Sequence, residues 1–123
     1  TITKISFKDV FRAVDYNEFE QLSNEFANTP HIVETYVSGT SGYIIYSNGF
    51  CEQWGRTSAI GRLVTVTLLA AFKDTNYSVL TTGLYTGGGT ENAWDYVRNI
   101  TATSFDIYQQ EGGCMWKACG YIN

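Results

Sequence analysis

From residue 31 onward the sequence is divided into short runs of β-branched and aromatic residues, separated by Gly, Asn, Asp and Ser. Short runs with turn residues between them are typical of an all-β sandwich or barrel. The runs predict eight strands: His31–Ser38, Tyr43–Ser47, Phe50–Arg56, Leu63–Leu69, Tyr77–Thr82, Trp94–Ile100, Ser104–Gln109 and Cys114–Tyr121. We therefore expect an antiparallel β-sandwich over residues 31–123, preceded by a different region over residues 1–30.

Asn48-Gly49 is the strongest turn signal, because this dipeptide favours a two-residue type I′ hairpin. Such a hairpin pairs Ser47 with Phe50, Ile45 with Glu52 and Tyr43 with Trp54 on one face, and Tyr46 with Cys51 and Ile44 with Gln53 on the other. Both faces then hold large apolar side chains, unlike a sheet with one solvated side. We expect a second chain to cover the second face.

Residues 1–30 are predicted to form an extended lead-in and one short helix. Asp15 is a good N-cap, and Glu18 three residues later completes a capping box. The helix should end before Pro30, because the residue preceding a proline is disfavoured in the α region.

Phe19, Leu22 and Phe26 form an apolar stripe on this helix, at spacings of three and four. A helix of about a dozen residues is marginal in isolation, so the stripe needs a packing partner. Two partners stay open: the chain's own β region, or copies of the same helix. The a-d-a order of the stripe favours the copies.

Charge and hydropathy exclude two classes of partner. The chain has 8 basic and 12 acidic residues, giving a net charge of −4, and its basic residues do not cluster. We expect no nucleic-acid binding, because no basic patch can neutralise phosphates. The longest apolar run, residues 68–72, is too short for membrane insertion.

Few residues suit catalysis or metal binding. His31 is the only histidine, and it lies at the junction between the helix and the first strand. Cys51, Cys114 and Cys119 lack paired C-x-x-C spacing, so we expect no metal site within one chain, no cofactor and no enzymatic activity. A metal shared by His31 residues on a symmetry axis stays open. The odd cysteine number favours free thiols, with Cys114 and Cys119 on opposite strand faces.

Several segments of the β region resemble one known family. Tyr46–Gly55 is similar to the S-[DN]-G-[WF]-x-E-Q segment of a C-terminal domain in tail fibres of tailed phages and prophages. Val64–Leu68 and Ala71–Val79 resemble that domain's apolar strand and its F-x-[DN]-x-x-Y-x-[VL] turn, and Ser104–Tyr108 and Trp116–Ile122 follow in the same order. The resemblance covers roughly residues 40–123, with departures at Cys51, Trp54 and residues 83–96.

This resemblance implies a β-sandwich at the tip of a homotrimeric fibre that binds a glycan or protein receptor on the bacterial surface. The rest of the tail fibre would precede residue 1. The fibre would be assembled in the host cytoplasm, as part of the virion, and would act at the bacterial surface. The resemblance also implies that the helix stripe of Phe19, Leu22 and Phe26 is trimerising. It transfers no catalytic or receptor-contact residue.

The glycine-rich segment 84–96 is the candidate receptor-binding loop. Sugar recognition needs aromatic faces and short polar groups, and loops on a rigid scaffold often carry such residues. The candidates are Tyr85, Glu91, Asn92, Trp94 and Asp95. Trp94 has a competing interpretation, since it also begins a predicted strand and can point into the core.

Two other functions stay open. A monomeric carbohydrate-binding module would share the aromatic richness, and a monomeric mass in solution would favour it. A small polysaccharide-degrading enzyme would use Glu91 and Asp95 as its carboxylate pair, and release of reducing ends from capsule or lipopolysaccharide would favour it.

The helix stripe predicts that Phe19→Ala combined with Leu22→Ala weakens self-association. Each truncation of a buried apolar side chain typically removes about 2–5 kcal/mol. Sedimentation should show the variant dissociating at higher concentrations than the parent. A parent chain that sediments as a monomer at micromolar concentration would contradict the prediction.

Overall fold

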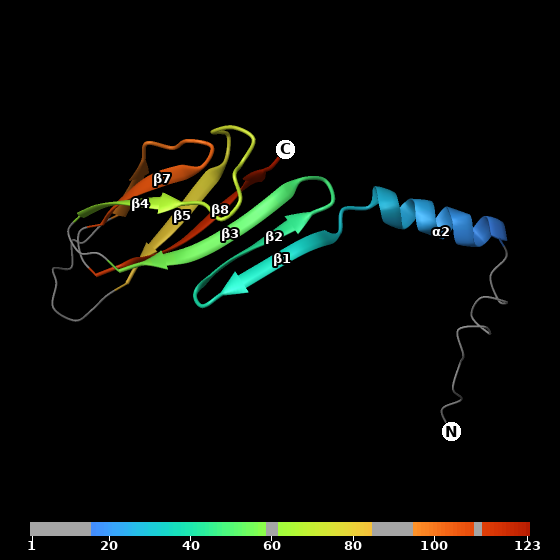
Figure 1. The fold of residues 1–123 in the computed structure, drawn as a ribbon, viewed down its shortest axis with the longest axis horizontal. Helices are drawn as coiled ribbons and strands as arrows, with labels where there is room; N and C mark the ends of the chain where they lie inside the picture. The colour runs from blue at the N-terminus through green and yellow to red at the C-terminus, as the bar shows by residue number, and fades with distance from the viewer. Residues whose placement is uncertain (1–15, 59–61, 85–94, 110–111) are drawn as a thin grey trace, which may run out of the picture. The chain divides into compact units, whose positions relative to one another are not determined.

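The computed structural model describes residues 16–58, 62–84, 95–109 and 112–123, in two compact units, Thr1–His31 and Ile32–Asn123. The first unit contains helix α2 (Tyr16–Asn28). The second contains strands β1 (Ile32–Ser38), β2 (Ser41–Tyr46), β3 (Phe50–Thr57), β4 (Arg62–Thr67), β5 (Ser78–Gly83), β6 (Asp95–Arg98), β7 (Ser104–Gln109) and β8 (Cys114–Tyr121) (Figure 1). The predicted all-β class, with one short N-terminal helix, is confirmed.

Helix α2 ends as predicted, just before Pro30. The Thr29 hydroxyl donates a hydrogen bond to the Glu25 carbonyl at 2.6 Å, and the Thr29 amide donates to the Phe26 carbonyl at 3.2 Å. These bonds satisfy carbonyls of the last turn that have no partner within the helix. The expected N-cap Asp15 lies outside the described residues.

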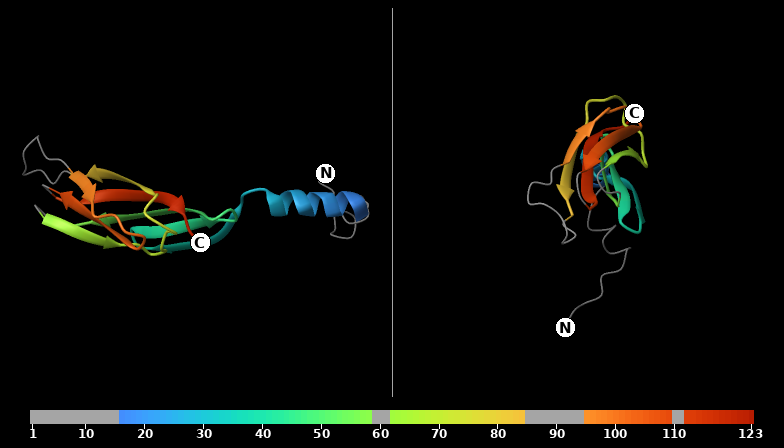
Figure 2. Two further views of the ribbon diagram at one scale, coloured as in Figure 1. Left: turned by 90° about the horizontal axis from the view of Figure 1, so that it is seen from above. Right: turned by 90° about the vertical axis from the view of Figure 1, so that its left-hand side faces the viewer.

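The strands of the second unit form two antiparallel sheets that face each other (Figure 2). The large sheet has the order β1-β2-β3-β8-β5, and the small sheet has the order β4-β7-β6. Phe105 and Ile107 of β7 are fully buried between the sheets. The Phe105 ring meets the Trp116 ring of β8 edge-on, with centroids 5.2 Å apart. This contact joins the small sheet to the middle of the large one.

The register of the β2–β3 hairpin differs from the prediction. Ile45 pairs with Cys51, Ile44 with Glu52, Tyr43 with Gln53 and Gly42 with Trp54, one residue away from the expected pairing. The Gly49 amide donates to the Tyr46 carbonyl at 2.9 Å, and Gly49 has φ +89°. A three-residue turn with a left-handed glycine at its end therefore replaces the two-residue turn. The predicted pairs across Asn48-Gly49 are wrong for this reason.

The corrected register keeps large apolar side chains on both faces of the hairpin. Tyr43, Ile45 and Cys51 share the inward face with buried Gln53. Ile44, Trp54 and Glu52 lie on the outward face. The expectation of two apolar faces therefore survives the shift of one residue.

The three cysteines are free thiols. Cys114 is buried on the inward face of β8, whereas Cys119, five residues along the strand, lies on the outward face and is half-buried. This confirms the expected opposite orientation. Burial raises the pKa of the Cys51 thiol to about 11, so this group is protonated and unreactive at neutral pH.

Two strands end earlier than predicted. β4 stops at Thr67, and the amides of Leu69 and Ala70 donate to the Gln53 side-chain oxygen at 3.0 and 3.1 Å instead of to a neighbouring strand. β6 stops at Arg98, because Asn99 adopts φ +54°, outside the extended region.

Gln53 is fully buried, and both its side-chain oxygen and its side-chain nitrogen are hydrogen-bonded to main-chain groups. Its side-chain nitrogen donates to the Ala70 carbonyl at 2.5 Å, while its oxygen accepts the two amides described above. The side chain thus ties the chain after β4 to the centre of the large sheet. A buried amide is stable only when its donors and acceptors are satisfied, as they are here.

Gln53→Leu is therefore expected to lower the free energy of unfolding by at least about 1–3 kcal/mol, because it leaves main-chain groups of residues 69 and 70 without this partner. Chemical denaturation monitored by tryptophan fluorescence would measure the change. Thr82→Leu, at an exposed outward position of β5, is the control and should change stability little. Equal stability of Gln53→Leu and the parent would contradict the role assigned to Gln53.

Candidate binding surfaces

The two ends of the sandwich differ in which parts of the chain they join. Ile32 pairs with Tyr46, and Phe50 pairs with Tyr121, so the chain enters the sandwich at the end that also holds the β2–β3 turn. We call this the entry end. At the other end, Cys114 pairs with both Thr57 and Gly83.

That other end, the loop end, collects the strand termini that flank residues 59–61, 85–94 and 110–111. Gln109 pairs with both Arg62 and Asp95, next to the Cys114 pairs of the other sheet. In Figure 1 these termini lie on the side of the sandwich away from the C-terminus. Connections that are distant in sequence thus leave from one end of the fold.

Hydrogen bonds hold the strand termini of the loop end together. The Thr57 hydroxyl is hydrogen-bonded to the buried side-chain oxygen of Gln109, which links the two sheets. The Cys114 amide donates to the Thr57 hydroxyl at 3.1 Å, and the Leu84 amide donates to the Gly113 carbonyl at 2.8 Å. The loop end is therefore a fixed platform for the segments that leave it.

Of the five candidate receptor residues, Asp95 lies within the described part of the chain. Tyr85, Glu91, Asn92 and Trp94 lie outside it. Asp95 begins β6, is half-buried, and shares the inward face of the small sheet with Gln109. Its carboxylate lies so close to Gly83 that a Cβ there would be 2.9 Å from Oδ2. Partial burial raises the pKa of the Asp95 carboxyl above its ordinary value.

A groove lies beside the small sheet, where β4 borders the strands of the large sheet. Its volume is about 360 Å³. The lining combines hydroxyls and one guanidinium with apolar groups: Ser41, Arg56, Thr57, Ser58, Val64, Thr65, Val66, Thr67, Leu69 and Trp116. Sequence reasoning missed this groove, because its walls come from strands whose proximity depends on the packing of the two sheets.

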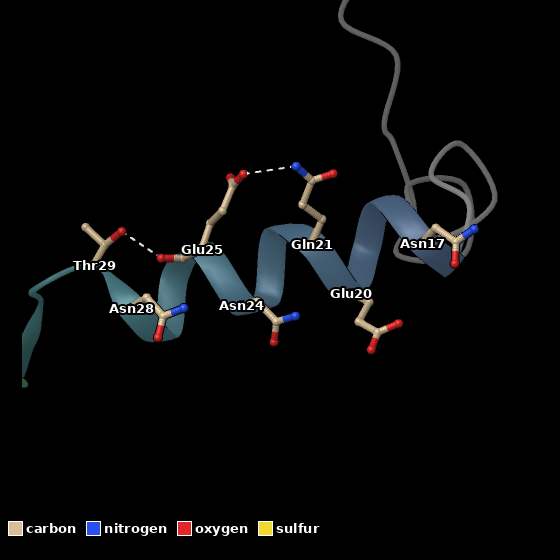
Figure 3. A pocket seen from close by; sticks show the side chains of 7 residues that line it. All are labelled: Asn17, Glu20, Gln21, Asn24, Glu25, Asn28 and Thr29. Carbon is tan, nitrogen blue, oxygen red and sulfur yellow. Dashed lines mark hydrogen bonds between the residues drawn. The ribbon is translucent and has the colours of Figure 1, made fainter.

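Helix α2 has two distinct sides. A shallow polar depression is lined by Asn17, Glu20, Gln21, Asn24, Glu25, Asn28 and Thr29 (Figure 3). The Gln21 side chain donates to the Glu25 carboxylate at 3.3 Å along this side. The stripe residues Phe19, Leu22 and Phe26 are absent from this lining, and each is at least 50% exposed. The helix is thus amphipathic, as the stripe predicts.

The β1–β2 hairpin contains the most exposed apolar strand of the sandwich. All seven residues of β1 are exposed, including Ile32, Val33, Tyr36 and Val37. Its partner β2 places Ile45 in the core. The small sheet therefore covers β3, β8 and β5 but leaves β1 open on both faces.

The residue types that ligate metals lie apart from one another in the described part of the chain. Across residues 16–58, 62–84, 95–109 and 112–123, no three His, Cys, Asp or Glu side chains gather as a metal site would require. His31 Nδ1 lies 2.7 Å from the Thr29 carbonyl, and its ring stacks on Phe26 at 4.3 Å. Within the same residues, no helix is long and apolar enough to cross a membrane.

Solved structures that match this chain include pyocin tail fibres. An N-truncated R1-type pyocin tail fibre matches with a TM-score of 0.56 and 16% identity, over 88% of this chain and 100% of that one. The C-terminal part of the P. aeruginosa R2 pyocin fibre matches with a TM-score of 0.53 and 22% identity, over 72% of this chain. The chain has the fold of pyocin tail fibres.

An N-truncated R2-type pyocin tail fibre gives a similar match, with a TM-score of 0.53 and 21% identity over 72% of this chain. This chain spans 26% and 38% of the two R2 structures. No family model and no curated protein sequence matches it. The expected resemblance to a tail-fibre C-terminal domain is thus confirmed at the level of the fold.

Asp95→Asn should make the protein slightly more stable near neutral pH. The pKa of Asp95 is raised in the folded state above its ordinary value of 3.8, so the folded chain holds this proton more tightly than the unfolded chain does. The parent protein therefore loses stability as pH rises through the interval above 3.8. The gain should stay under about 1 kcal/mol, because solvent screens a half-exposed charge. Thermal melts across this pH range should show that the melting temperatures of the parent and the Asp95→Asn variant converge in acid.

Asp106→Asn is the control, because its effect on stability near neutral pH should have the opposite sign. Hydrogen bonds from Asn99 and Thr65 lower the pKa of Asp106, so this carboxylate stabilises the fold at neutral pH and loses that effect in acid. Asp106→Asn should therefore be less stable than the parent near neutral pH. The same pH profile for both variants would refute the assignment to Asp95.

Proposed function

We propose that this chain is the tip domain of a phage or phage-like tail fibre, which forms a homotrimer and attaches to a receptor on the bacterial surface. The observation that carries the proposal is the fold shared with pyocin tail fibres. In this proposal the chain binds rather than catalyses, and the rest of the fibre precedes it. The fibre is assembled in the host cytoplasm and acts at the bacterial surface as part of the virion.

Exposed apolar surface supports the homotrimer. Val37, Leu22 and Phe26 are 67%, 57% and 63% exposed, although each belongs to a regular element with an apolar stripe or face. Exposed apolar side chains that gather on one stripe or face of an element mark interaction sites in soluble proteins. Copies of the same chain would bury it.

The end at which the chain enters the sandwich supports receptor binding at the opposite end, the loop end. The chain arrives from α2 at the entry end, so a fibre that precedes residue 1 leads to that end first. The loop end is then distal, and it gathers three connections on a hydrogen-bonded platform. The strands on either side of residues 85–94 have Gly83 and Asp95 at this end. The proposed glycan contact is formed by Tyr85, Glu91, Asn92 and Trp94, together with Asp95.

Light scattering tests the assembly. A mass three times the 13.7 kDa of one chain is expected. A monomer that binds glycans would instead show a carbohydrate-binding module. Release of reducing ends from capsule or lipopolysaccharide by the parent chain would show an enzyme.

Binding of fluorescently labelled trimer to a panel of bacteria, P. aeruginosa strains included, tests attachment. The variant Tyr85→Ala with Asn92→Ala should lose binding while it keeps its mass and melting temperature. The matched control, Thr75→Ala with Asn76→Ala, changes exposed residues in the connection before β5, at the entry end. If the loop variant binds any strain as well as the parent does, the receptor site lies elsewhere on the head.

A further inference from the structure

We infer that the β1–β2 hairpin is the head's subunit contact: one face of the hairpin packs against the preceding copy of the chain and the other face against the following copy. This inference rests on the proposed homotrimer and names the surface that forms it. The occupant of each face is another copy of this chain.

The hairpin exposes apolar groups on both faces. The pairing Val37↔Gly42 and Gly42↔Trp54 places Val37 on the outward face of the large sheet, where it is 67% exposed. Tyr36 pairs with Tyr43, and Tyr43 with buried Gln53, so Tyr36 lies on the inward face. Tyr36 is still 46% exposed, because the small sheet does not extend over β1.

Apart from a register shift between Ile32 and Glu34, the hairpin lacks the usual protection of an edge strand. Glu34 is the one charged residue in Ile32–Ser38 and Ser41–Tyr46, and neither strand contains lysine or proline. The Glu34 carboxylate also accepts a hydrogen bond from the Tyr43 hydroxyl at 2.9 Å. Exposed apolar edge strands without such protection pair with or pack against other chains, and interface cores are likewise poor in charge.

The link to α2 favours copies of this chain over another partner. Residues 29–31 separate the end of α2 from the start of β1. Three extended residues span at most roughly 11 Å. If the helices associate through Leu22 and Phe26, the first residues of the three β1 strands must lie close to the same axis.

Three-fold symmetry also requires two different surfaces on each chain. A ring is closed by heterologous contacts, in which one patch meets a different patch of the next copy. The two faces of β1 supply two such patches in one element. The outward face carries the aliphatic Ile32, Val37 and Ile44 together with Tyr46, while the inward face carries the rings of Tyr36 and Tyr43, which stack at 5.7 Å.

Val37→Lys tests the outward face, with Leu80→Lys as its matched control. The chain of pairs Val37↔Gly42↔Trp54↔Lys117↔Leu80 puts the two residues in one row, at opposite edges of the same sheet. Their side chains are 67% and 68% exposed, so neither lysine should disturb the fold of one chain. Val37→Lys should raise the concentration of half-dissociation at least about tenfold, because it buries an unpaired charge, whereas Leu80→Lys should not change it.

Tyr36→Lys tests the inward face, with Tyr96→Lys as its control. Tyr96 pairs with Tyr108 and stacks on it at 5.1 Å on the small sheet, as Tyr36 pairs and stacks with Tyr43. Both changes remove a half-exposed stacked ring, but only Tyr36→Lys should dissociate the assembly. Sedimentation and light scattering give the readout.

Cysteine labelling provides a measurement that does not depend on tolerance of lysine. In a Cys119→Ser background, Val37→Cys should resist maleimide in the assembled protein, while Leu80→Cys should react. Fast labelling of Val37→Cys in a trimer would overturn the inference. So would equal dissociation of Val37→Lys and Leu80→Lys, which would assign the contact to the whole outward face.

The outcomes separate this inference from the proposed function. A parent chain that is monomeric at every concentration overturns both. A trimeric parent whose Val37→Lys and Tyr36→Lys variants stay trimeric overturns the hairpin contact and leaves the proposed tail-fibre function standing.

Discussion

The pairing of β3 with β8 is the constraint on which the rest of the sandwich depends. Eight consecutive pairs join them, from Phe50↔Tyr121 to Thr57↔Cys114. β8 brings Trp116 and Ala118 beneath the small sheet, and β3 brings Gln53, which fixes the chain after β4. β2 and β5 then add to the outer sides of this pair. Because the two strands are far apart in sequence, the core forms only when this long-range pairing closes.

The strands were predictable because period-two alternation and turn residues are local signals. The eight predicted runs match the eight strands, with differences of a few residues at their ends. The hairpin register was not predictable from Asn48-Gly49, since the same dipeptide fits a three-residue turn when Gly49 alone is left-handed. One extra loop residue shifts every pair along both strands.

Other features depend on tertiary packing that alternation does not encode. Gln53 is a polar residue type and would be expected at the surface, yet it is fully buried. The sequence hint to its burial is its spacing of two residues from Cys51, which places both side chains on one face of the strand. The order β1-β2-β3-β8-β5 likewise has no local signal. The candidate contacts Tyr85, Glu91, Asn92 and Trp94 came from residue chemistry and fall outside the described residues, so they stay predictions. Among the candidate receptor residues, Asp95 shows why the alternation of side chains along a strand matters. Its position on β6 places it on the inward face of the small sheet.

The hydrogen-bonded loop end has a consequence for how such a domain can diversify. Thr57, Gln109 and Cys114 fix the strand termini through side-chain and main-chain bonds that belong to the sandwich itself. Stability is therefore supplied by groups that do not belong to the connecting segments. When stability and recognition reside in separate residues, recognition can change by substitution or insertion without a matching loss of stability. In the tail-fibre role proposed above, such a scaffold would let the receptor contact change one connection at a time while the sandwich stays the same.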